Sequence, residues 1–338
     1  MIETLTCLGS TGSIGVQALD VAKLLKLKII ALTANSRVDI IENQIREFKP
    51  LYAALADEKS ANGLKIRVAD TGTKILSGKE GVDFCASLST DCVLNSIVGI
   101  AGLEPTVCAI KSQNKIALAN KETMVAGGEI VNALAEDYGV SVLPVDSEHS
   151  AVFQSLQGCS DAKQVKKIIL TASGGPFFGK KKEELENVTV EEALNHPNWS
   201  MGAKITIDSA TMMNKGLELI EAARLYNVPA EKIDILVHRQ SVVHSMVEFC
   251  DNSVIAQLGV PDMRIPIQYA LTYPDRVESP VKELDLAQYA DLTFSKPDYE
   301  TFKCIDYCKE ALMKGGAYPA AVNAANEQAN RMFRQGKI

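Results

Sequence analysis

Three polar side chains that can bind ions or phosphate occur within one helical turn near the middle of the chain. Asn214 and Lys215 precede Glu218 by four and three residues, so all three share one face if this segment is helical. An amide, an ammonium group and a carboxylate would then converge. For Lys215 and Glu218 alone, an ordinary ion pair on a capped surface helix is the simpler interpretation, so the pattern by itself leaves both readings open.

The residues just before this segment also have the composition of a site. Residues 196–202 read HPNWSMG, an ordered loop interrupted by proline and glycine, and Trp199 is the chain's only tryptophan. Residues 204–208 alternate between polar and apolar types, which predicts a strand. Ser209 follows at the position of a helix N-cap. A loop, a strand and a capped helix are therefore expected in succession.

A pair of acidic residues follows a different predicted strand. Asp146 and Glu148 come directly after an apolar run at residues 140–145. Alternate residues at a strand end point the same way, so two carboxylates there would repel each other unless they share a proton or a cation. Oxygen ligands of this kind suit Mg²⁺ or Mn²⁺. A solvated loop end is the alternative.

A glycine-rich turn lies near the start of the chain. The strand predicted at residues 5–8 leads into GSTGSIG at residues 9–15 and then into a helical pattern at residues 16–25. Glycines at such a turn let the backbone approach a pyrophosphate, and the helix N-terminus offers unpaired N–H groups to it. The spacing is GxxGxxG rather than the common GxGxxG, so a tight turn without a ligand is the alternative.

The end of the next predicted strand, residues 28–33, indicates which dinucleotide would bind. Asn35, Ser36 and Arg37 follow it. A hydroxyl and a cation at this place suit the 2′-phosphate of NADP, whereas an Asp or Glu would suit the ribose of NAD. Asp39 lies further along, where a helix cap explains it better. The stretch therefore predicts NADP.

Alternating strand and helix patterns over the first 148 residues predict an α/β fold with a mostly parallel sheet covered on both faces. A helix is expected at residues 39–48, and further strands are expected at residues 52–56, 64–68, 92–98, 115–118 and 140–145. Ligands in such folds bind outside the carboxyl ends of the strands. The triplets 120–122 and 146–148 follow two of those ends, so both are expected to face the cofactor.

Beyond residue 150 the pattern changes to short strands in succession, which predicts an α+β sheet domain. These strands are expected at residues 167–171, 232–237, 241–249 and 253–258. The turn at residues 173–177, SGGPF, could receive a phosphate through its hydroxyl and open backbone, and a hairpin or bulge corner is the equal alternative. A Pro-punctuated connection at residues 273–297 precedes helical patterns at residues 299–314 and 320–334.

Composition limits the class of protein. A length of 338 residues suggests two or three domains. The apolar and charged fractions, 46% and 23%, are those of a globular protein. A net charge of −7 with both signs mixed argues against a general nucleic-acid binder. No apolar run is long enough to span a membrane, and no signal peptide is recognisable, so a cytoplasmic protein is expected. The cysteines are scattered along the sequence, and they are expected to be reduced in that compartment.

Eight motifs occur in order along almost the whole chain. They are GSTGSIG at residues 9–15, LANKE at 118–122, PVDSEHSA at 144–151, SGGPF at 173–177, HPNWSMG at 196–202, DSATMMNKGLE at 208–218, HRQSVVHSMVEF at 238–249 and LGVPDMR at 258–264. Together they resemble the motifs of the 1-deoxy-D-xylulose 5-phosphate reductoisomerase family. One motif alone could occur by chance, but eight in family order leave little room for that.

The resemblance implies a homodimeric enzyme that uses NADPH and Mg²⁺ or Mn²⁺. It would convert 1-deoxy-D-xylulose 5-phosphate, a small phosphorylated sugar, to 2-C-methyl-D-erythritol 4-phosphate, in the non-mevalonate pathway of isoprenoid biosynthesis. Two other functions stay open at this point. The chain could be a simple NADP-linked dehydrogenase of a phosphorylated hydroxy acid, which needs no metal carboxylates. It could also be a non-catalytic regulatory protein that binds NADPH without turnover.

The resemblance also implies a domain organisation. A Rossmann-like NADPH-binding domain is expected at residues 1–148, and a central catalytic domain at residues 149–272 with a mobile flap at residues 195–203. A linker at residues 273–297 and a helical segment at residues 298–338 follow. Members of the family continue into further helices, so this last segment is expected to be shortened.

Individual roles follow from the same resemblance. The metal ligands would be Asp146, Glu148 and Glu218. The catalytic residues would be these three carboxylates together with Lys121 and His196. Besides Glu148, Glu218 and His196, the residues that bind substrate would be Ser147, Ser173, Trp199, Ser209, Asn214 and Lys215. NADPH would be bound by Gly9, Ser10, Thr11, Gly12, Ser13, Ile14, Asn35, Ser36, Arg37, Asn120, Lys121, Glu122, Met201 and Gly202. His244 and Met263 would complete the pocket.

The assignment of Arg37 to the 2′-phosphate leads to a test. Arg37→Ala should weaken NADPH binding by roughly 1.5–3 kcal/mol, the usual contribution of a hydrogen bond to a charged group. NADH binding should change little, because NADH has no 2′-phosphate. Dissociation constants of both cofactors, measured on the variant and the parent protein, check this. Equal losses for NADPH and NADH would remove Arg37 from the cofactor site.

Overall fold

A computed structural model of the chain describes residues 2–199 and 201–338, and Ser200 of the expected flap therefore lies outside the described residues. The chain divides into two compact units. The first comprises Met1–Thr123, Glu129–Asp146 and Met263–Val281. The second comprises Met124–Gly128, Ser147–Asp262 and Lys282–Ile338.

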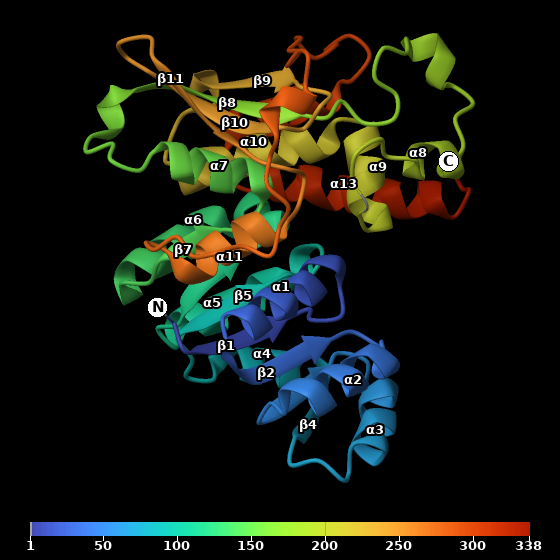
Figure 1. Ribbon diagram of the computed structural model, residues 1–338. Helices are drawn as coiled ribbons and strands as arrows, with labels where there is room; N and C mark the ends of the chain where they lie inside the picture. Colours follow the sequence, from blue (N-terminus) through green and yellow to red (C-terminus); the bar gives the residue numbers. More distant parts are fainter. Residues whose placement is uncertain (1, 200) are drawn as a thin grey trace. The chain divides into compact units, whose positions relative to one another are not determined.

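A seven-stranded parallel sheet forms the centre of the first unit, in the order β4-β3-β2-β1-β5-β6-β7 (Figure 1). The strands are β1 (Thr4–Leu8), β2 (Lys28–Ala34), β3 (Tyr52–Leu55), β4 (Lys74–Ser77), β5 (Cys92–Asn95), β6 (Lys115–Leu118) and β7 (Val142–Pro144). Strands β1, β5 and β6 are buried along almost their whole length, as expected for a sheet covered on both faces. The order reverses beside β1, which pairs with both β2 and β5. This reversal is the point at which ligands bind in such sheets.

Helices connect the parallel strands, since a parallel pair cannot be joined by a tight turn. They are α1 (Ser13–Leu24), α2 (Val38–Phe48), α3 (Glu58–Arg67), α4 (Gly78–Ser87), α5 (Leu103–Lys111), α6 (Lys121–Tyr138) and the short 3₁₀ helix η1 (Ile100–Gly102). A further helix, α11 (Arg264–Thr272), contacts α1, β6 and β7 (Figure 1). The α/β fold with a parallel sheet is therefore confirmed.

One strand of the first unit was wrongly predicted. Residues 64–68 form the end of α3 and not a strand. The helix begins at a real N-cap, because the carboxylate of Asp57 accepts a hydrogen bond from the backbone N–H of Ser60 at 2.7 Å. Ala61 and Leu64, three residues apart, are its buried positions. The strand that follows β3 is instead β4, which the sequence pattern did not reveal.

Two boundaries also differ from expectation. Arg37, and not Asp39, is the N-cap residue of α2. Asp39 lies in the first turn of that helix, where its carboxylate is 2.7 Å from the guanidinium of Arg67. β5 ends at Asn95, three residues earlier than predicted. The cap expected at Asp39 is therefore replaced by an ion pair between neighbouring helices.

The second unit contains a four-stranded mixed sheet in the order β11-β10-β8-β9. Its strands are β8 (Val165–Ala172), β9 (Ile233–Val237), β10 (Val243–Phe249) and β11 (Val254–Leu258). β10 runs antiparallel to β8 and β11, while β8 and β9 are parallel. The predicted α+β sheet domain is therefore present.

Helices of the second unit pack around this sheet. They are α7 (Ser147–Ser155), α8 (Val190–Leu194), α9 (Ala203–Ala210), α10 (Met213–Leu225), α12 (Cys304–Lys314) and α13 (Tyr318–Arg334). Short 3₁₀ helices occur at Ala162–Gln164, Lys182–Leu185, Ala230–Lys232 and Leu286–Gln288. α7 contacts β10 and β11, and α10 contacts β8, β9 and α12. The two helices that carry Glu148 and Glu218 thus rest on one sheet.

The strand predicted at residues 204–208 is wrong, because these residues form α9. The carboxylate of Asp208 is almost fully buried and accepts from Lys204 Nζ at 2.8 Å, four residues earlier. It also accepts from the amides of Asn326 and Asn330 on α13, at 3.0 and 2.9 Å. Lys204 and Asp208, which the strand prediction placed on an exposed face, therefore form hydrogen bonds inside the unit, with each other and with α13.

The compact units divide the chain differently from the expected domains. Residues 263–272 contain α11 and belong to the first unit, although a central domain was expected to reach residue 272. The C-terminal helices α12 and α13 belong to the second unit, where both contact α10.

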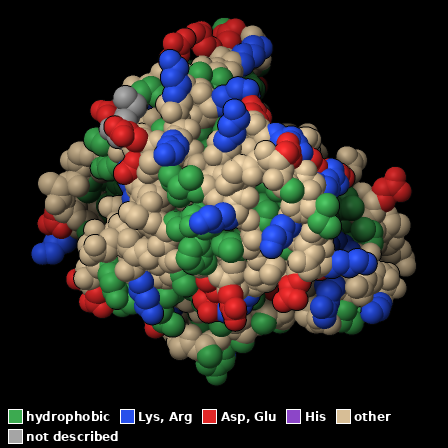
Figure 2. Space-filling view, turned by 90° about the horizontal axis from the view of Figure 1, so that it is seen from below, with side chains coloured by type: hydrophobic (Ala, Val, Ile, Leu, Met, Phe, Trp, Pro, Cys, Tyr) green, Lys and Arg blue, Asp and Glu red, His purple; other side chains and the backbone are tan. Residues whose placement is uncertain are grey.

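No helix among the described residues is long and apolar enough to cross a membrane. The surface visible in Figure 2 carries basic and acidic side chains interspersed among neutral and apolar ones.

Close packing of α10 against α12 depends on Gly216. A Cβ atom at this position would lie 2.7 Å from Cys308 Sγ and 3.0 Å from the carbonyl oxygen of Cys304. Gly216→Ala should therefore destabilise the protein by about 1–3 kcal/mol, the usual cost of overpacking. Urea denaturation measures this difference.

Gly63 provides a matched control, because it lies in α3 with nothing within 4 Å of its virtual Cβ. Gly63→Ala should stabilise the protein by roughly 0.5–1 kcal/mol. A Gly216→Ala variant as stable as the parent protein would show that α10 and α12 can separate without cost.

Candidate active site

The glycine-rich turn between β1 and α1 is fixed by close backbone packing and a buried glutamine. Gly9 has a φ of +77°, and a Cβ there would lie 2.9 Å from the carbonyl group of Ser96. The side chain of Ser10 points inward and donates to Gln44 Oε1 at 2.7 Å, while Gln44 Nε2 donates to Ser10 O at 2.8 Å. The side chain of Ser10 therefore stabilises the turn from the protein interior. Its partner Gln44 was not predicted from the sequence.

The N-terminus of α1 opens directly from this turn. Its N-cap residue, Gly12, has no side chain to satisfy the first N–H groups of the helix. Thr11, Ser13 and Ile14 flank this end, and Arg37 Nη1 donates to the carbonyl oxygen of Thr11 at 3.1 Å. Uncapped N–H groups with a guanidinium beside them suit a phosphate group. Asn35 and Ser36, also predicted here, lie exposed at the end of β2.

The residues after β6 make mostly structural contacts. Asn120 is the N-cap of α6 and accepts from the backbone N–H of Thr123 at 2.7 Å, while its amide donates to Glu122 Oε2 at 3.2 Å. Lys121 Nζ lies 3.0 Å from Asp146 Oδ2, and both residues are more than nine-tenths buried. The triplets 120–122 and 146–148, which were predicted to follow two strand ends, are therefore connected by the ion pair between Lys121 and Asp146 in the first unit.

A buried cluster of charges lies between α7 and α10 in the second unit. Lys215 Nζ contacts Glu218 Oε2 and lies 3.3 Å from Glu148 Oε1. Carboxylate oxygens of Glu148 and Glu218 lie within 4.8 Å of each other. Asn214 donates to Glu218 Oε1, and Ser147 Oγ donates to Glu148 Oε2 at 2.8 Å. The helical face predicted for α10 is therefore confirmed.

The alternative of a surface ion pair is wrong, because Lys215 is only 4% exposed and Glu218 only 1%. The argument from strand ends is also corrected, since Glu148 lies in the first turn of α7 and not on a strand. The two carboxylates come together because two helices pack side by side. Two carboxylates held this close together are a set of oxygen donors that suits a divalent cation.

Two further residues, the buried His149 and the partly buried Tyr226, support this cluster and were not predicted. His149 Nε2 donates to the carbonyl oxygen of Glu218 at 3.0 Å, and His149 Nδ1 lies 3.6 Å from Glu221 Oε2. The hydroxyl of Tyr226 donates to the carbonyl oxygen of His149. These contacts connect the start of α7 to α10 from both sides. His149 lies within the PVDSEHSA motif, directly after Glu148. This position in the motif was the only indication in the sequence that His149 could belong to the site.

The small-residue turn after β8 lies against the end of α9. Gly174 and Gly175 have φ values of +80° and +67°. A Cβ at Gly175 would lie 2.5 Å from the carbonyl oxygen of Ser209. The absence of a side chain at Gly175 therefore lets the turn that contains Ser173 lie directly against the backbone of Ser209. Ser209 is not an N-cap as predicted, since it lies in the last turn of α9 and its Oγ donates to the carbonyl oxygen of Ile205 at 2.9 Å.

His196 joins the expected flap to this turn. Its Nδ1 accepts from the backbone N–H groups of Asn198 and Trp199, at 3.2 and 3.0 Å. Nε2 must then carry the ring proton and donate to Ser173 Oγ at 2.8 Å. Burial, together with the charge of Arg239, lowers the pKa of His196 to about 4. The imidazole is therefore neutral at physiological pH, and the Ser173 hydroxyl keeps its own hydrogen for a ligand oxygen.

Four more predicted residues, Trp199, Met201, Gly202 and His244, belong to the second unit, whereas Met263 is the N-cap residue of α11 in the first. The Trp199 ring is tilted toward His244, with ring centroids 6.2 Å apart. Burial lowers the pKa of His244 to about 4, so this ring is also neutral. Gly202 is the N-cap of α9 and Met201 precedes it, half-buried. The family resemblance implies that both bind NADPH, and both belong to the second unit.

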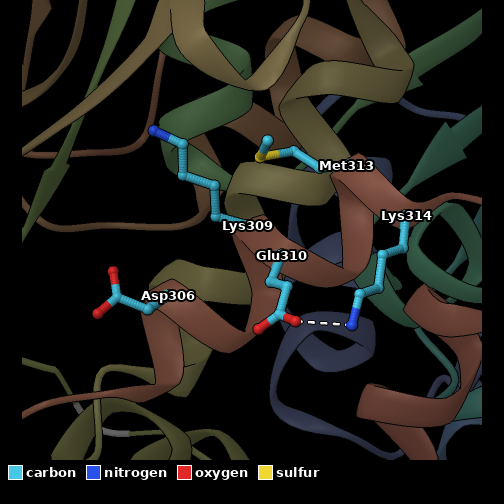
Figure 3. A pocket seen from close by; sticks show the side chains of 5 residues that line it. All are labelled: Asp306, Lys309, Glu310, Met313 and Lys314. Carbon is cyan, nitrogen blue, oxygen red and sulfur yellow. Dashed lines mark ion pairs between the residues drawn. The ribbon is translucent and has the colours of Figure 1, made fainter.

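A shallow hollow of about 570 Å³ occurs elsewhere in the second unit (Figure 3). It is lined by Asp306, Lys309, Glu310, Met313 and Lys314, and Glu310 and Lys314 form an ion pair across one turn at 2.7 Å. All five side chains come from one face of α12. None of the predicted site residues lines this hollow, so it does not define the active site.

A glycine-rich turn at the switch point of a parallel sheet, and a second unit that buries carboxylates beside hydroxyls, define a dinucleotide-dependent oxidoreductase with a cation site. Family models match most of the chain. The model for 1-deoxy-D-xylulose 5-phosphate reductoisomerase matches residues 5–128, that for its C-terminal domain matches residues 142–226, and one for a DXP reductoisomerase C-terminal domain matches residues 258–338. The chain belongs to the 1-deoxy-D-xylulose 5-phosphate reductoisomerase family.

Individual relatives agree with this membership. The reductoisomerase of Acetivibrio thermocellus is 58% identical over 339 residues, which cover 100% of this chain and 89% of the relative. The Zymomonas mobilis enzyme in complex with NADPH has a TM-score of 0.93 at 43% identity, covering 100% of this chain and 88% of that one. A DOX-P reductoisomerase with NADPH, fosmidomycin and magnesium has a TM-score of 0.96 at 43% identity, with coverages of 100% and 86%.

The tautomer of His196 predicts how the flap responds to pH. The folded pKa of about 4 lies below the ordinary value of 6.5. The flap arrangement should therefore be fully stable above pH 6.5 and lose stability as the pH falls toward 4, because a proton on Nδ1 would oppose two N–H donors. Fluorescence of Trp199, the only tryptophan, should change over this range.

His196→Gln removes the titrating group from the flap and should reduce the change to the part that His244 contributes. His244 titrates beside Trp199 as well, so His244→Gln is the matched control and should retain the His196-dependent part. A pH response that survives in His196→Gln and disappears in His244→Gln would assign the transition to His244 instead.

Proposed function

We propose that this chain catalyses the isomerisation and reduction of 1-deoxy-D-xylulose 5-phosphate to 2-C-methyl-D-erythritol 4-phosphate with NADPH and Mg²⁺ or Mn²⁺. The observation that carries the proposal is the buried cluster of Glu148, Lys215 and Glu218 in a chain 58% identical to a named reductoisomerase. A plain dehydrogenase has no need for carboxylates buried in this way, since their desolvation is costly. A regulatory protein has no need for them either.

Asp146, Glu148 and Glu218 are proposed to hold the metal ion. A divalent ion bound there would polarise the substrate carbonyl and favour loss of a neighbouring hydroxyl proton. In support, Lys215 already contacts both Glu148 and Glu218, so a positive charge between these carboxylates is tolerated. Asp146 precedes Glu148 by two residues and pairs with Lys121. Lys121 is proposed to lie near the reacting hydroxyl groups.

The substrate phosphate is proposed to bind where the 173–177 turn meets α9 and α10. The Ser173 hydroxyl can donate to a phosphate oxygen because His196 and the N–H of Gly175 donate to it. The amide of Asn214 and the N-terminus of α10 add further donors. Ser209 would exchange its bond to Ile205 for one to phosphate. An anchored phosphate supplies binding energy away from the reacting carbons, which can drive closure of the flap.

NADPH is proposed to bind at the turn of residues 9–15, with Arg37 near its 2′-phosphate. When bound, it supplies the hydride that reduces the rearranged aldehyde. The chain's part is to receive the pyrophosphate at the uncapped end of α1. Asn120 and Glu122 are proposed to lie by the nicotinamide half. The flap, with Trp199, is proposed to exclude water from a reactive intermediate.

A homodimer and a cytoplasmic location complete the proposal. The edge strand β11 exposes Val254 and Ile255 by about half, at 50% and 48%. An apolar edge of this kind is normally covered by another chain. The eight cysteines are all free, as expected in a reducing compartment.

One assay tests the reaction. NADPH oxidation is followed with 1-deoxy-D-xylulose 5-phosphate, first with Mn²⁺ or Mg²⁺ and then after chelation. We expect turnover that chelation abolishes and added metal restores. Oxidation that persists fully after chelation would favour a plain dehydrogenase, and NADPH binding without oxidation would favour a regulatory protein.

Glu218→Gln tests the carboxylate in the same assay. The variant keeps the shape of the side chain but removes its charge, so Mn²⁺ affinity and turnover should fall by about 10-fold or more. NADPH binding, measured by fluorescence, should stay nearly unchanged because the glycine turn is untouched. Unchanged turnover would leave Glu218 as a structural partner of Lys215.

A further inference from the structure

Arg239, in the loop between β9 and β10, holds the turn that presents Ser173. Its Nη1 donates to the carbonyl oxygens of Ser173 and Gly175, both at 2.8 Å. Its guanidinium lies over the ring of Phe178, 5.0 Å from the centroid. Two consecutive glycines with positive φ leave this turn with little side-chain restraint of its own. Arg239 supplies the missing restraint through the backbone.

The same residue is also connected to the flap. The amide of Asn198 donates to the carbonyl oxygen of Arg239 and to Ser241 Oγ, the latter at 2.9 Å. His196, two residues before Asn198, donates to Ser173 Oγ. Arg239 therefore contacts both segments that orient the Ser173 hydroxyl, one through its side chain and one through its backbone.

The charge of Arg239 distinguishes it from the other cations of these motifs. Lys204 is paired with Asp208 at 2.8 Å, and Lys215 is paired with Glu148 and Glu218. The contacts of the Arg239 guanidinium are two carbonyl oxygens and an aromatic ring, with no carboxylate in ion-pair range among the described residues. Carbonyl dipoles orient a guanidinium but do not cancel its charge. A partly desolvated positive charge thus remains beside Ser173.

We propose that Arg239 is a positioning and specificity-determining residue for the phosphate group of the substrate. It fixes the turn so that the Ser173 hydroxyl faces the phosphate, and its uncompensated charge favours a dianion there. This role rests on the proposed function, because it takes the turn of residues 173–177 as the phosphate subsite. The preference of the chain for a phosphorylated substrate would then depend on Arg239, which does not itself bind the substrate.

Steady-state kinetics on two substitutions test the role. Arg239→Gln removes the charge and should raise the KM for 1-deoxy-D-xylulose 5-phosphate about 10-fold, while kcat and the KM for NADPH change less than about threefold. Arg239→Lys keeps the charge but cannot bridge two carbonyls in the same way, so its KM should lie between those of the parent and Arg239→Gln. A structural defect alone would lower kcat and offer no such graded recovery.

Lys180→Gln is the matched control, because this lysine follows Ser173 in the loop after β8 and its ammonium group lies over the ring of Phe177, 5.3 Å from the centroid. It removes one positive charge from the neighbourhood and should leave the KM unchanged. The proposal is overturned if Arg239→Gln changes the substrate KM less than twofold, or if Lys180→Gln raises it equally. It is also overturned if the KM for NADPH rises in parallel with that for the substrate.

Binding of inorganic phosphate separates this inference from the proposed reaction. Trp199 fluorescence reports phosphate binding at the flap without any turnover. The parent protein and Lys180→Gln should bind phosphate alike, and Arg239→Gln should bind it about 10-fold more weakly. If the parent protein does not turn over the sugar phosphate but this difference persists, the proposed reaction fails and the role of Arg239 stands. Equal phosphate affinity in the parent and Arg239→Gln would refute the role whichever reaction the chain catalyses.

Discussion

The second unit depends on the burial of opposite charges between two helices. Glu218 on α10 is 1% exposed, and removal of a carboxylate from water is costly unless charge and hydrogen bonds compensate it. Lys215 and Asn214, one turn away, supply that compensation. Because Lys215 also reaches Glu148 on α7, the two helices must keep a fixed distance. The cluster proposed to bind the metal ion is thus also a constraint on the fold.

The surrounding structure maintains this arrangement. His149 donates to the carbonyl oxygen of Glu218, and Tyr226 donates to the carbonyl oxygen of His149, so two hydrogen bonds to the backbone connect α7 with α10. On its other side, α10 packs so closely on α12 that a Cβ atom at residue 216 would lie 2.7 Å from Cys308 Sγ. The hydroxyl groups proposed for phosphate are placed by a second close contact, between Gly175 and Ser209. Backbone packing, and not the reactive side chains, therefore sets the spacing of the site.

The flap follows a different principle, in which protonation controls shape. His196 accepts two backbone N–H groups and donates to Ser173, and this pattern requires a neutral ring. Burial and the charge of Arg239 keep it neutral by lowering its pKa to about 4. Arg239 contributes to the turn, the flap and the local charge at once. The loop proposed to close over the substrate phosphate is thereby ordered by a cation and a neutral imidazole.

The sequence alone determined the fold class, the glycine turn, most strands and the helical face of Asn214, Lys215 and Glu218. These features depend on local periodicity and on motifs that are continuous in the chain. Only the tertiary structure decided that Lys215 and Glu218 are buried, that residues 204–208 are helical, and that Arg239 holds the turn of Ser173. Lys204 and Asp208 looked like one face of a strand because their partners, Asn326 and Asn330, lie more than a hundred residues away. Burial and pairing of charges are properties of neighbours in space, and periodicity along the chain carries no information about them.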